Sequence, residues 1–309
     1  MKAPIFKSIL VTGHQGLIGR EVIEELRTNK EIRRGIVSPP SVLRTVPLVY
    51  GFDSNESFNT WMLDFKRFEN KVRDVDLIIH CGAISDSRCN DSRLWELNYA
   101  ATQMLGEYAK SKRAKFLYFS SCAAIEPITP YGWSKRIGED ILTAYLPKED
   151  LCIFRPFNVW AWNREANKSN PSIISKILDR TLEVVYRGCV RDFIEVSDVV
   201  SAVTLVMQDW KPGIFEIGYS IEVELTALVD DIYENLPLAK PLYVDECPIA
   251  KRLVCNPDFK LPNWSPKRGN AYMHTPQFAK HMDAMYGTAG SEDELPSDEH
   301  LVTEAFHDS

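Results

Sequence analysis

The stretch Ile9-Leu-Val-Thr-Gly13-His-Gln-Gly16-Leu-Ile-Gly19, near the start of the chain, decides the fold. It begins with an apolar run typical of a buried strand, and Ile18, Val22 and Leu26 then recur at the spacing of one helix face. The N-terminus of a helix offers free N–H groups and a partial positive charge, which suit a phosphate. Strand, glycine turn and helix therefore predict a phosphate-binding site, although a glycine-rich turn without a ligand is the simpler alternative.

The three glycines of this turn have separate expected roles. Gly13 permits the sharp turn, Gly16 lets the backbone approach a pyrophosphate, and Gly19 lets the helix pack closely on the strand. Because the turn lies between a strand and a helix, we expect it to bind a dinucleotide. The other residues of the turn that we expect to contact this cofactor are Gln15, Leu17 and Ile18.

The composition is that of an ordinary globular protein and argues against several kinds of partner. The chain has 309 residues, of which 45% are hydrophobic and 26% charged, and its net charge of −7 argues against binding to nucleic acid. No apolar run is long enough to span a bilayer and no signal peptide is recognisable, so we expect a cytoplasmic protein. The seven cysteines are scattered without a Cys-x-x-Cys pair, which indicates reduced thiols and gives no reason to expect zinc.

Short apolar segments alternate with helical patterns through the first half of the chain. Strands that alternate with helices indicate a parallel, doubly wound sheet of the Rossmann type. The further strands that we predict cover residues 47–53, 76–83, 115–121 and 151–155, and the clearest later helices cover 94–105 and 131–146. The expected fold class is therefore α/β, with a smaller C-terminal substrate lobe.

The regular alternation loosens in the second half of the chain. We therefore expect a dinucleotide-binding domain over residues 1–162, completed by parts of 190–220. Residues 163–286, which include a predicted strand near 190–194, should form most of the substrate lobe as separate insertions. The acidic tail, residues 287–309, is rich in Gly, Ser and acids and is expected to be disordered.

Asp53 ends the second predicted strand, where an acid accepts hydrogen bonds from the adenosine ribose of a bound dinucleotide. It lies farther from the glycines than the usual spacing of about 20 residues, and it could instead start a turn. Since an aspartate repels a 2′-phosphate, we expect NAD to bind better than NADP, with NADP as the alternative.

Further cofactor contacts are expected after the next strands. Asp64 and Phe65 lie where adenine could bind. The strand over residues 76–83 ends in small residues, which let a cofactor lie across the end of the strand. These small residues are Cys81, Gly82 and Ala83.

The segment Tyr131-Gly-Trp-Ser-Lys135 is the second anchor of the site. Residues four apart share one face of a helix, so Lys135 can lie beside the Tyr131 hydroxyl. A neighbouring cation favours the phenolate, and we expect it to lower the pKa of Tyr131 from about 10. Tyr131 is then a proton acceptor for a substrate hydroxyl that loses hydride. A solvated Tyr–Lys pair is the alternative, weakened because the glycine turn and a strand ending in Ser120-Ser121 precede the pair.

With these motifs the chain resembles the extended short-chain dehydrogenase/reductase family, the nucleotide-sugar epimerases and dehydratases. Besides the two anchors and the strand ends, the resemblance rests on Asn98 with Thr102, Arg155-Pro-Phe-Asn158-Val, Arg191-Asp-Phe-Ile-Glu-Val, Asp198 and Gly213-Ile-Phe-Glu-Ile-Gly218. It covers the chain to about Trp264. It implies that Ser121 orients the substrate hydroxyl and that Asn98 and Pro156 lie at the cofactor. We also expect Tyr131 and Lys135 to contact the cofactor.

The resemblance also assigns the substrate contacts. It implies that Asn158 and Arg191 contact the nucleotide diphosphate, and the guanidinium fork of an arginine matches phosphate oxygens. A surface ion pair with Asp192 or another acid is the alternative for Arg191. The segment Arg164-Glu-Ala-Asn-Lys168-Ser resembles a loop of the ADP-glycero-manno-heptose 6-epimerases whose lysine is a second catalytic base. Lys168 is thus a catalytic candidate, with a solvated loop lysine as the alternative.

The segment before Tyr131 departs from the family. After Ser121 the chain reaches Tyr131 almost at once, where relatives have a long substrate loop. Cys122 and Ala123 stand where the dehydratases carry Asp-Glu. A cysteine at the Cys122 position occurs in the fucose-synthase branch, so Cys122 is either a substrate contact or a small buried residue.

We therefore expect an NAD(P)-dependent enzyme that epimerises a nucleotide-activated sugar through a transient keto-sugar, with Tyr131 as acid and base. The alternatives are a nucleotide-sugar reductase or 4,6-dehydratase of the same family, and a catalytically silent NAD(P)-binding sensor. The resemblance also implies a homodimer, joined through helices near residues 98–110 and 131–146.

Overall fold

The computed structural model describes residues 6–29, 48–52, 65–66, 69, 75–86, 89–161, 172–178, 181–234, 241–245 and 250–267. Four of the predictions lie outside these residues. They concern Asp53, Asp64, the lysine-bearing loop with Lys168, and the tail at 287–309.

The central sheet has six parallel strands in the order β10-β5-β4-β3-β1-β2. Their bounds are β1 (Ser8–Thr12), β2 (Leu48–Phe52), β3 (Leu77–His80), β4 (Lys115–Phe119), β5 (Leu151–Pro156) and β10 (Gly213–Ile217). Because β1 lies between β2 and β3, the winding of the chain reverses at β1. Ligands of doubly wound sheets bind beyond the carboxyl ends of the strands at such a reversal. The predicted doubly wound parallel sheet is confirmed.

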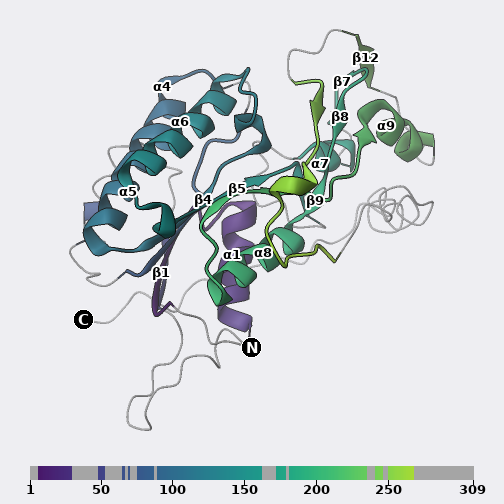
Figure 1. Cartoon of the computed structure of the whole chain (residues 1–309). Coiled ribbons are helices and arrows are strands. Elements are labelled where there is room, and N and C mark those ends of the chain that lie inside the picture. Colours follow the sequence, from purple (N-terminus) through teal and green to yellow (C-terminus); the bar gives the residue numbers. More distant parts are fainter. Residues whose placement is uncertain are drawn as a thin grey trace, which may run out of the picture.

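Helices cover both faces of this sheet (Figure 1). One face carries α1 (Leu17–Thr28) and α8 (Val196–Gln208), and the other carries α5 (Ala101–Lys112) and α6 (Pro130–Tyr145). Since side chains alternate along a strand, Ile9 joins the core with α1 and α8, whereas Leu10 joins the core with α5 and α6. The sheet is thus buried on both faces, which explains the continuous apolar runs of its strands.

Short helical segments lead into α5 and connect the later strands. They are α4 (Ser92–Trp95), the π-helical turn η1 (Glu96–Ala100), η2 (Cys122–Ala124) and η3 (Lys148–Asp150). Thr129 caps α6, accepting a hydrogen bond from the Gly132 N–H at 3.1 Å, and Pro130 occupies the first turn. This cap fixes where α6 begins, and therefore where Tyr131 lies.

The second half of the described chain forms a group of short strands and helices beside the main sheet (Figure 1). Its elements are β6 (Val159–Trp160), α7 (Ile173–Leu178), β7 (Val184–Tyr186), β8 (Val190–Arg191), β9 (Ile194–Glu195), β11 (Val223–Glu224), α9 (Leu225–Glu234), β12 (Leu242–Val244), β13 (Arg252–Leu253) and η4 (Pro257–Phe259). It has its own apolar core around Trp160, Phe193 and Leu228. The division of the chain into a cofactor domain and a substrate lobe stays a prediction.

The single strand predicted near residues 190–194 is wrong in one respect. It is two short strands in different sheets: β8 pairs with β11 and β13, while β9 pairs with β6. The break falls at Asp192, whose fully buried carboxylate accepts backbone N–H groups from other segments. A side chain with such partners turns the chain there, which an apolar pattern alone does not reveal.

Across the part of the chain that the structure describes, no helix has the length and apolar character that crossing a membrane requires.

Candidate active site

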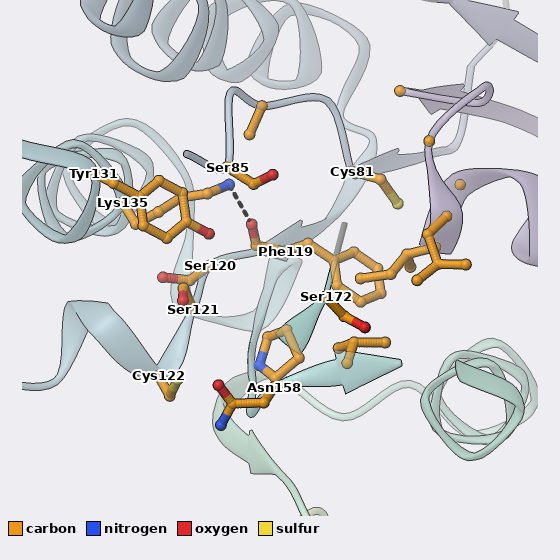
Figure 2. A pocket seen from close by; sticks show the side chains of 18 residues that line it. Cys81, Ser85, Phe119, Ser120, Ser121, Cys122, Tyr131, Lys135, Asn158 and Ser172 are labelled. Atoms are coloured by element: carbon orange, nitrogen blue, oxygen red, sulfur yellow. Dashed lines mark hydrogen bonds between the residues drawn. The ribbon is translucent and has the colours of Figure 1, made fainter. Parts of the chain in front are cut away.

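A cavity of about 370 Å³ opens at the carboxyl ends of β1, β3, β4 and β5 (Figure 2). It is the place where the reversal of the sheet leads us to expect a ligand. The described residues that line it are Gly13, Gly16, Leu17, Ile18, Gly19, Cys81, Ala83, Ser85, Phe119, Ser120, Ser121, Cys122, Tyr131, Lys135, Pro156, Asn158, Val159 and Ser172.

The glycine turn forms one wall of the cavity. Gly13 has a φ of 68°, in the left-handed region, and a Cβ there would lie 2.6 Å from the Gly82 Cα. A Cβ on Gly19 would overlap the Gly13 carbonyl, so the close approach that Gly19 permits is to the turn itself and not to the predicted strand. Both positions therefore require glycine.

The start of α1 has the properties of an anion site. Gly16, Leu17 and Ile18 line the cavity at this helix end. The capping residue, Gly16, makes no side-chain hydrogen bond to the first turn. First-turn N–H groups without such a cap, together with the helix dipole, suit the diphosphate of a dinucleotide. These residues therefore fit a dinucleotide cofactor.

Two of the predicted cofactor residues support the cavity without lining it. The Gly82 N–H donates to the Thr12 hydroxyl at 3.3 Å, below the glycine turn. The Asn98 side chain accepts from the Ile84 N–H at 2.8 Å, and donates to the Ile84 carbonyl and the Ser134 hydroxyl, each at 2.9 Å. Asn98 thus joins the segment after β3 to the start of α6.

Two further predicted contacts are not brought to the cavity. The Phe65 ring is buried, with its centroid 5.2 Å from that of Tyr108, in the core beneath α5. The side chain of Phe65 is therefore a packing residue, and it does not line the cavity. Gln15 lies in the turn but is not among the lining residues either. Of the predicted cofactor residues beyond the glycine turn, Cys81, Ala83, Tyr131, Lys135 and Pro156 do line it.

Tyr131 and Lys135 extend from α6 toward the end of β4, where Ser121 lies (Figure 2). Lys135 is almost wholly buried. Its Nζ donates to the Phe119 carbonyl at 2.7 Å and lies 5.0 Å from the centroid of the Tyr118 ring. Burial lowers the pKa of Lys135 to about 8. The ammonium group is thus fixed in position and still charged at neutral pH.

The prediction that the pKa of Tyr131 is lowered is wrong when only the groups of the protein itself act on the phenol. Burial raises the pKa of Tyr131 to about 12, and a hydrogen bond from Ser121 opposes this rise without overcoming it. The Lys135 ammonium group donates to a carbonyl instead of lying against the phenol. Tyr131 is therefore a protonated phenol at neutral pH, and any further stabilisation of its phenolate must come from a bound cation.

Two of the three predicted substrate residues lie on the opposite wall. Cys122 and Asn158 line the cavity, and the Asn158 side-chain amide donates to the Asp192 carbonyl at 2.6 Å. Burial raises the pKa of Cys122 to about 11, so its thiol stays protonated at neutral pH. Cys122 is thus both a lining residue and a small buried residue.

Arg191 is buried, and it does not line the cavity. Its Nη1 donates to the Val190 carbonyl at 2.9 Å and the Lys251 carbonyl at 3.1 Å, whereas its buried Nη2 has no hydrogen-bond partner among the described residues. The Asp192 carboxylate accepts backbone N–H groups instead. The alternative of a surface ion pair between these two residues is therefore wrong.

The structure adds five lining residues that the sequence did not single out for a role. These are Ser85, Phe119, Ser120, Val159 and Ser172. Phe119 and Ser120 directly precede the predicted Ser121, so their position at the end of that strand could have indicated that they line the cavity. Ser172 lies just before α7, after the last predicted lining residue along the chain, and no motif marks it.

The described residues contain no group of three or more His, Cys, Asp or Glu side chains that could hold a metal ion.

Comparisons with known proteins agree with this geometry. The model of the NAD dependent epimerase/dehydratase family matches residues 9–218. A provisionally named UDP-glucose 4-epimerase of Methanocaldococcus jannaschii is 28% identical over 262 residues, which cover 74% of this chain and 82% of that protein.

Two solved structures share the fold. The Thermus thermophilus UDP-glucose 4-epimerase in complex with NAD has a TM-score of 0.66 at 18% identity, covering 89% of this chain and 98% of that one. The Helicobacter pylori ADP-L-glycero-D-manno-heptose-6-epimerase has a TM-score of 0.65 at 21% identity, covering 91% and 96%. With the family model matching more than half of its length, the chain belongs to the NAD dependent epimerase/dehydratase family, and is an enzyme of that family with NAD as its cofactor.

Proposed function

We propose that this protein is a cytoplasmic enzyme that epimerises a nucleotide-activated sugar through a transient keto-sugar. The observation that carries the proposal is one cavity lined by the glycine turn and by Ser121, Tyr131 and Lys135. The names of the relatives support epimerisation, since they include a UDP-glucose 4-epimerase and a heptose 6-epimerase. None of the six described cysteines forms a disulfide bond, which suits a reducing compartment.

The acid–base work falls to Tyr131. Its phenol oxygen accepts the proton of a sugar hydroxyl and returns it when the opposite configuration forms. NAD, when bound, supplies an acceptor that takes a hydride from the sugar carbon and gives it back to the other face. The positive charge of the nicotinamide favours the phenolate, and the Ser121 hydroxyl orients the substrate hydroxyl.

The nucleotide end of the substrate is held by Arg191 and Asn158. The unpaired Nη2 of Arg191 supports this role, because a buried guanidinium N–H without a partner is costly and a diphosphate oxygen satisfies it. Because Arg191 does not line the cavity, reaching the ligand requires that side chain to move.

The role of Lys168 distinguishes two routes by which the opposite configuration of the sugar can form. Lys168 lies outside the described residues. If Lys168 is a second base, Lys168→Met stops epimerisation. If the keto-sugar turns in the site and Tyr131 serves both faces, Lys168→Met weakens substrate binding at most. Comparing kcat with KM for this variant separates the two routes.

A nucleotide-sugar reductase is the second candidate, and the position of Cys122 in the cavity wall favours it. A dehydratase is less well supported, because Cys122 and Ala123 stand where that branch carries Asp-Glu. A reductase consumes one reduced cofactor per product, whereas an epimerase consumes none. The cofactor balance of the reaction therefore separates these activities.

A homodimer formed through α5 and α6 is part of the proposal. Three exposed aromatic side chains support it, on α6 and on the segments that lead into α5: Trp95 in α4 is 36% exposed, Tyr99 in η1 39% and Trp133 in α6 50%. Such side chains favour burial against a second copy of the chain. Light scattering at micromolar concentration tests this, and a monomer would contradict it.

The whole proposal is tested with NAD-loaded protein and a panel of UDP-, dTDP-, GDP- and ADP-hexoses. Proton NMR of the products should reveal one pair of epimers approached from both directions, without net NADH. A 4-keto-6-deoxy product would refute the epimerase proposal. Firm cofactor binding without turnover of any nucleotide sugar would favour a catalytically silent sensor. Titration with NADP in parallel tests whether Asp53 selects NAD.

A further inference from the structure

A buried acidic residue, Glu139, lies on the helix face that carries Tyr131 and Lys135. The three residues are spaced by four, so they are stacked along one side of α6. Glu139 is 2% exposed, although glutamate is almost never buried without a partner. None of the roles assigned above uses it.

The Glu139 carboxylate has three hydrogen bonds from two residues at the strand ends. The Ser120 hydroxyl donates to Oε1 at 2.5 Å. Arg155, at the end of β5, donates from Nε to Oε1 at 2.8 Å and from Nη2 to Oε2 at 2.5 Å. Glu139 thus ties the ends of β4 and β5 together beneath the cavity, with the two-pronged geometry that makes such pairs strong.

These contacts complete a pattern between α6 and the end of β4. The Phe119 carbonyl accepts from Lys135, the Ser120 hydroxyl donates to Glu139, and Ser121 and Tyr131 line the same cavity beside these bonds. Two consecutive residues of one strand end are therefore each held by a residue of the helix, and the third, Ser121, follows them directly. A shift of Ser120 would move both of its neighbours, and with them the two groups that handle the proton.

We propose that Glu139 is a positioning residue of this active site, which holds the end of β4 so that Ser121, Tyr131 and Lys135 stay aligned. The inference rests on the proposed function for its catalytic consequence. Glu139 touches neither the sugar nor the cofactor, and it acts through Ser120 and Arg155.

The charge of Glu139 also acts on Lys135. The groups around Lys135 come from β3 and the segment after it (His80 and Cys81), from β4 (Tyr118), and from α6 itself (Tyr131 and Glu139). Burial keeps His80 and Cys81 uncharged at neutral pH by lowering the pKa of His80 and raising that of Cys81. Of these groups, the Glu139 carboxylate is then the one whose negative charge favours the protonated form of Lys135.

The test compares Glu139→Gln with Asp140→Asn, the neighbouring carboxylate on the exposed side of the same helix. In Glu139→Gln we expect kcat to fall by about 10- to 100-fold, because misplacement of a catalytic group by about 1 Å has that effect. KM and NAD affinity should change little. The alkaline limb of the rate profile should move to lower pH, since loss of the carboxylate lowers the pKa of Lys135. Asp140→Asn should match the wild type.

A second variant separates positioning from folding. Glu139→Gln with Arg155→Met removes both charges of the buried pair, which often restores stability. We expect its Tm to recover while the loss of kcat and the shifted pH profile remain. Recovery of kcat together with Tm would show that Glu139 only stabilises the fold, and would overturn the proposal. An unshifted pH profile with unchanged kcat in Glu139→Gln would also overturn it.

One further readout does not depend on the sugar. NMR of NAD-loaded protein with isotope-labelled lysine reports the pKa of Lys135 without any substrate. We expect a lower pKa in Glu139→Gln than in Asp140→Asn. If this shift appears and the wild type turns over no nucleotide sugar, the proposed function fails while the positioning role stands. If epimerisation is found and neither the pKa nor kcat responds to Glu139→Gln, the positioning role alone fails.

Discussion

The two walls of the cavity are built by different means. On the cofactor side, the ligand faces backbone, glycines and small residues at the ends of β1 and β3, which the sheet itself holds in place. On the side proposed for the substrate, Asn158 lines the cavity, whereas the buried Arg191 lies outside its lining. Both residues belong to segments outside the main sheet. The comparison suggests that the chemistry is fixed by the fold, whereas the choice of sugar depends on segments that can change separately.

On the proposed substrate side, hydrogen bonds to Asp192 hold the segments in place, as the main sheet does on the cofactor side. Its buried carboxylate accepts the N–H groups of Tyr219 at 3.1 Å, Ser220 at 2.7 Å and Cys255 at 3.3 Å, and its carbonyl accepts from Asn158. One residue thus joins β8, the end of β10 and the segment after β13. If the two walls are independent, a change on one should leave binding at the other intact.

The largest effect is expected at Tyr131, where the walls meet. Tyr131→Phe keeps the ring but removes the proton acceptor, and such groups contribute about 10²- to 10⁴-fold in rate. We expect a loss of kcat in that range with unchanged affinity for NAD and for the nucleotide sugar, measured by steady-state kinetics and calorimetry. Tyr145→Phe, on the same helix outside the cavity, is the matched control. Retained turnover in Tyr131→Phe would exclude Tyr131 as the acid and base.

Arg191 tests whether the substrate wall is separate. Arg191→Met should weaken nucleotide-sugar binding by about 10- to 100-fold, since a hydrogen bond to a charged group contributes about 1.5–3 kcal/mol. NAD affinity should stay the same. Arg252→Met removes a more exposed arginine that pairs with Glu222, and serves as the control. Equal losses of NAD and sugar affinity in Arg191→Met would show that the two walls are coupled.

His80 tests how firmly the cofactor wall is held. It is buried in β3 between the hydroxyls of Thr12 at 2.6 Å and Thr102 at 2.9 Å, and burial lowers its pKa from 6.5 to about 3. Between these values the unfolded chain binds a proton that the folded protein does not. Stability should therefore fall as the pH drops below 6.5, by at most about 1.4 kcal/mol per unit from this group.

The measurement is the free energy of unfolding in urea at pH 6.5 and pH 4.5. The wild type should lose more stability over this interval than His80→Gln, which lacks the titrating group. Parallel pH dependences in the two proteins would mean that His80 is already protonated in the folded state. The substrate wall has no part in this effect, so the pH dependence of Arg191→Met should follow the wild type.

The smallest effect is expected at Cys122. Its thiol is protonated at neutral pH because burial raises its pKa to about 11, so an epimerase has no need of it as a base. Cys122→Ser should change kcat by less than about 10-fold. A loss in the range of about 10²- to 10⁴-fold, typical of an acid–base group, would favour the reductase.

The sequence predicts the cofactor wall better than the substrate wall, for a physical reason. The turn from Gly13 to Gly19 and the pair of Tyr131 and Lys135 depend on local spacing, and the structure brings both to one cavity. The ends of the strands can be predicted because the apolar runs stop there. Local sequence patterns thus predict most of the strands and helices of the main sheet.

The remaining features depend on contacts between distant segments. The break at Asp192 comes from N–H groups more than 25 residues away, and Ser172 reaches the cavity through the packing of separate short elements. The pKa of Tyr131 is raised by burial, and the spacing of residues on a helix does not predict how deeply a side chain is buried. The position of Phe65 in the sequence predicts a contact with adenine, whereas its ring packs in the apolar core.

The most direct test of epimerisation follows one hydrogen atom. The nucleotide sugar selected by the panel is prepared with deuterium at the carbon whose configuration changes, and is incubated with wild-type protein in ordinary water. The account predicts that the epimeric product keeps its deuterium at that same carbon, because hydride is removed and returned within one turnover. Deuterium on carbon 6 of a 4-keto-6-deoxy sugar, or its complete loss to water or to free NADH, would contradict the account.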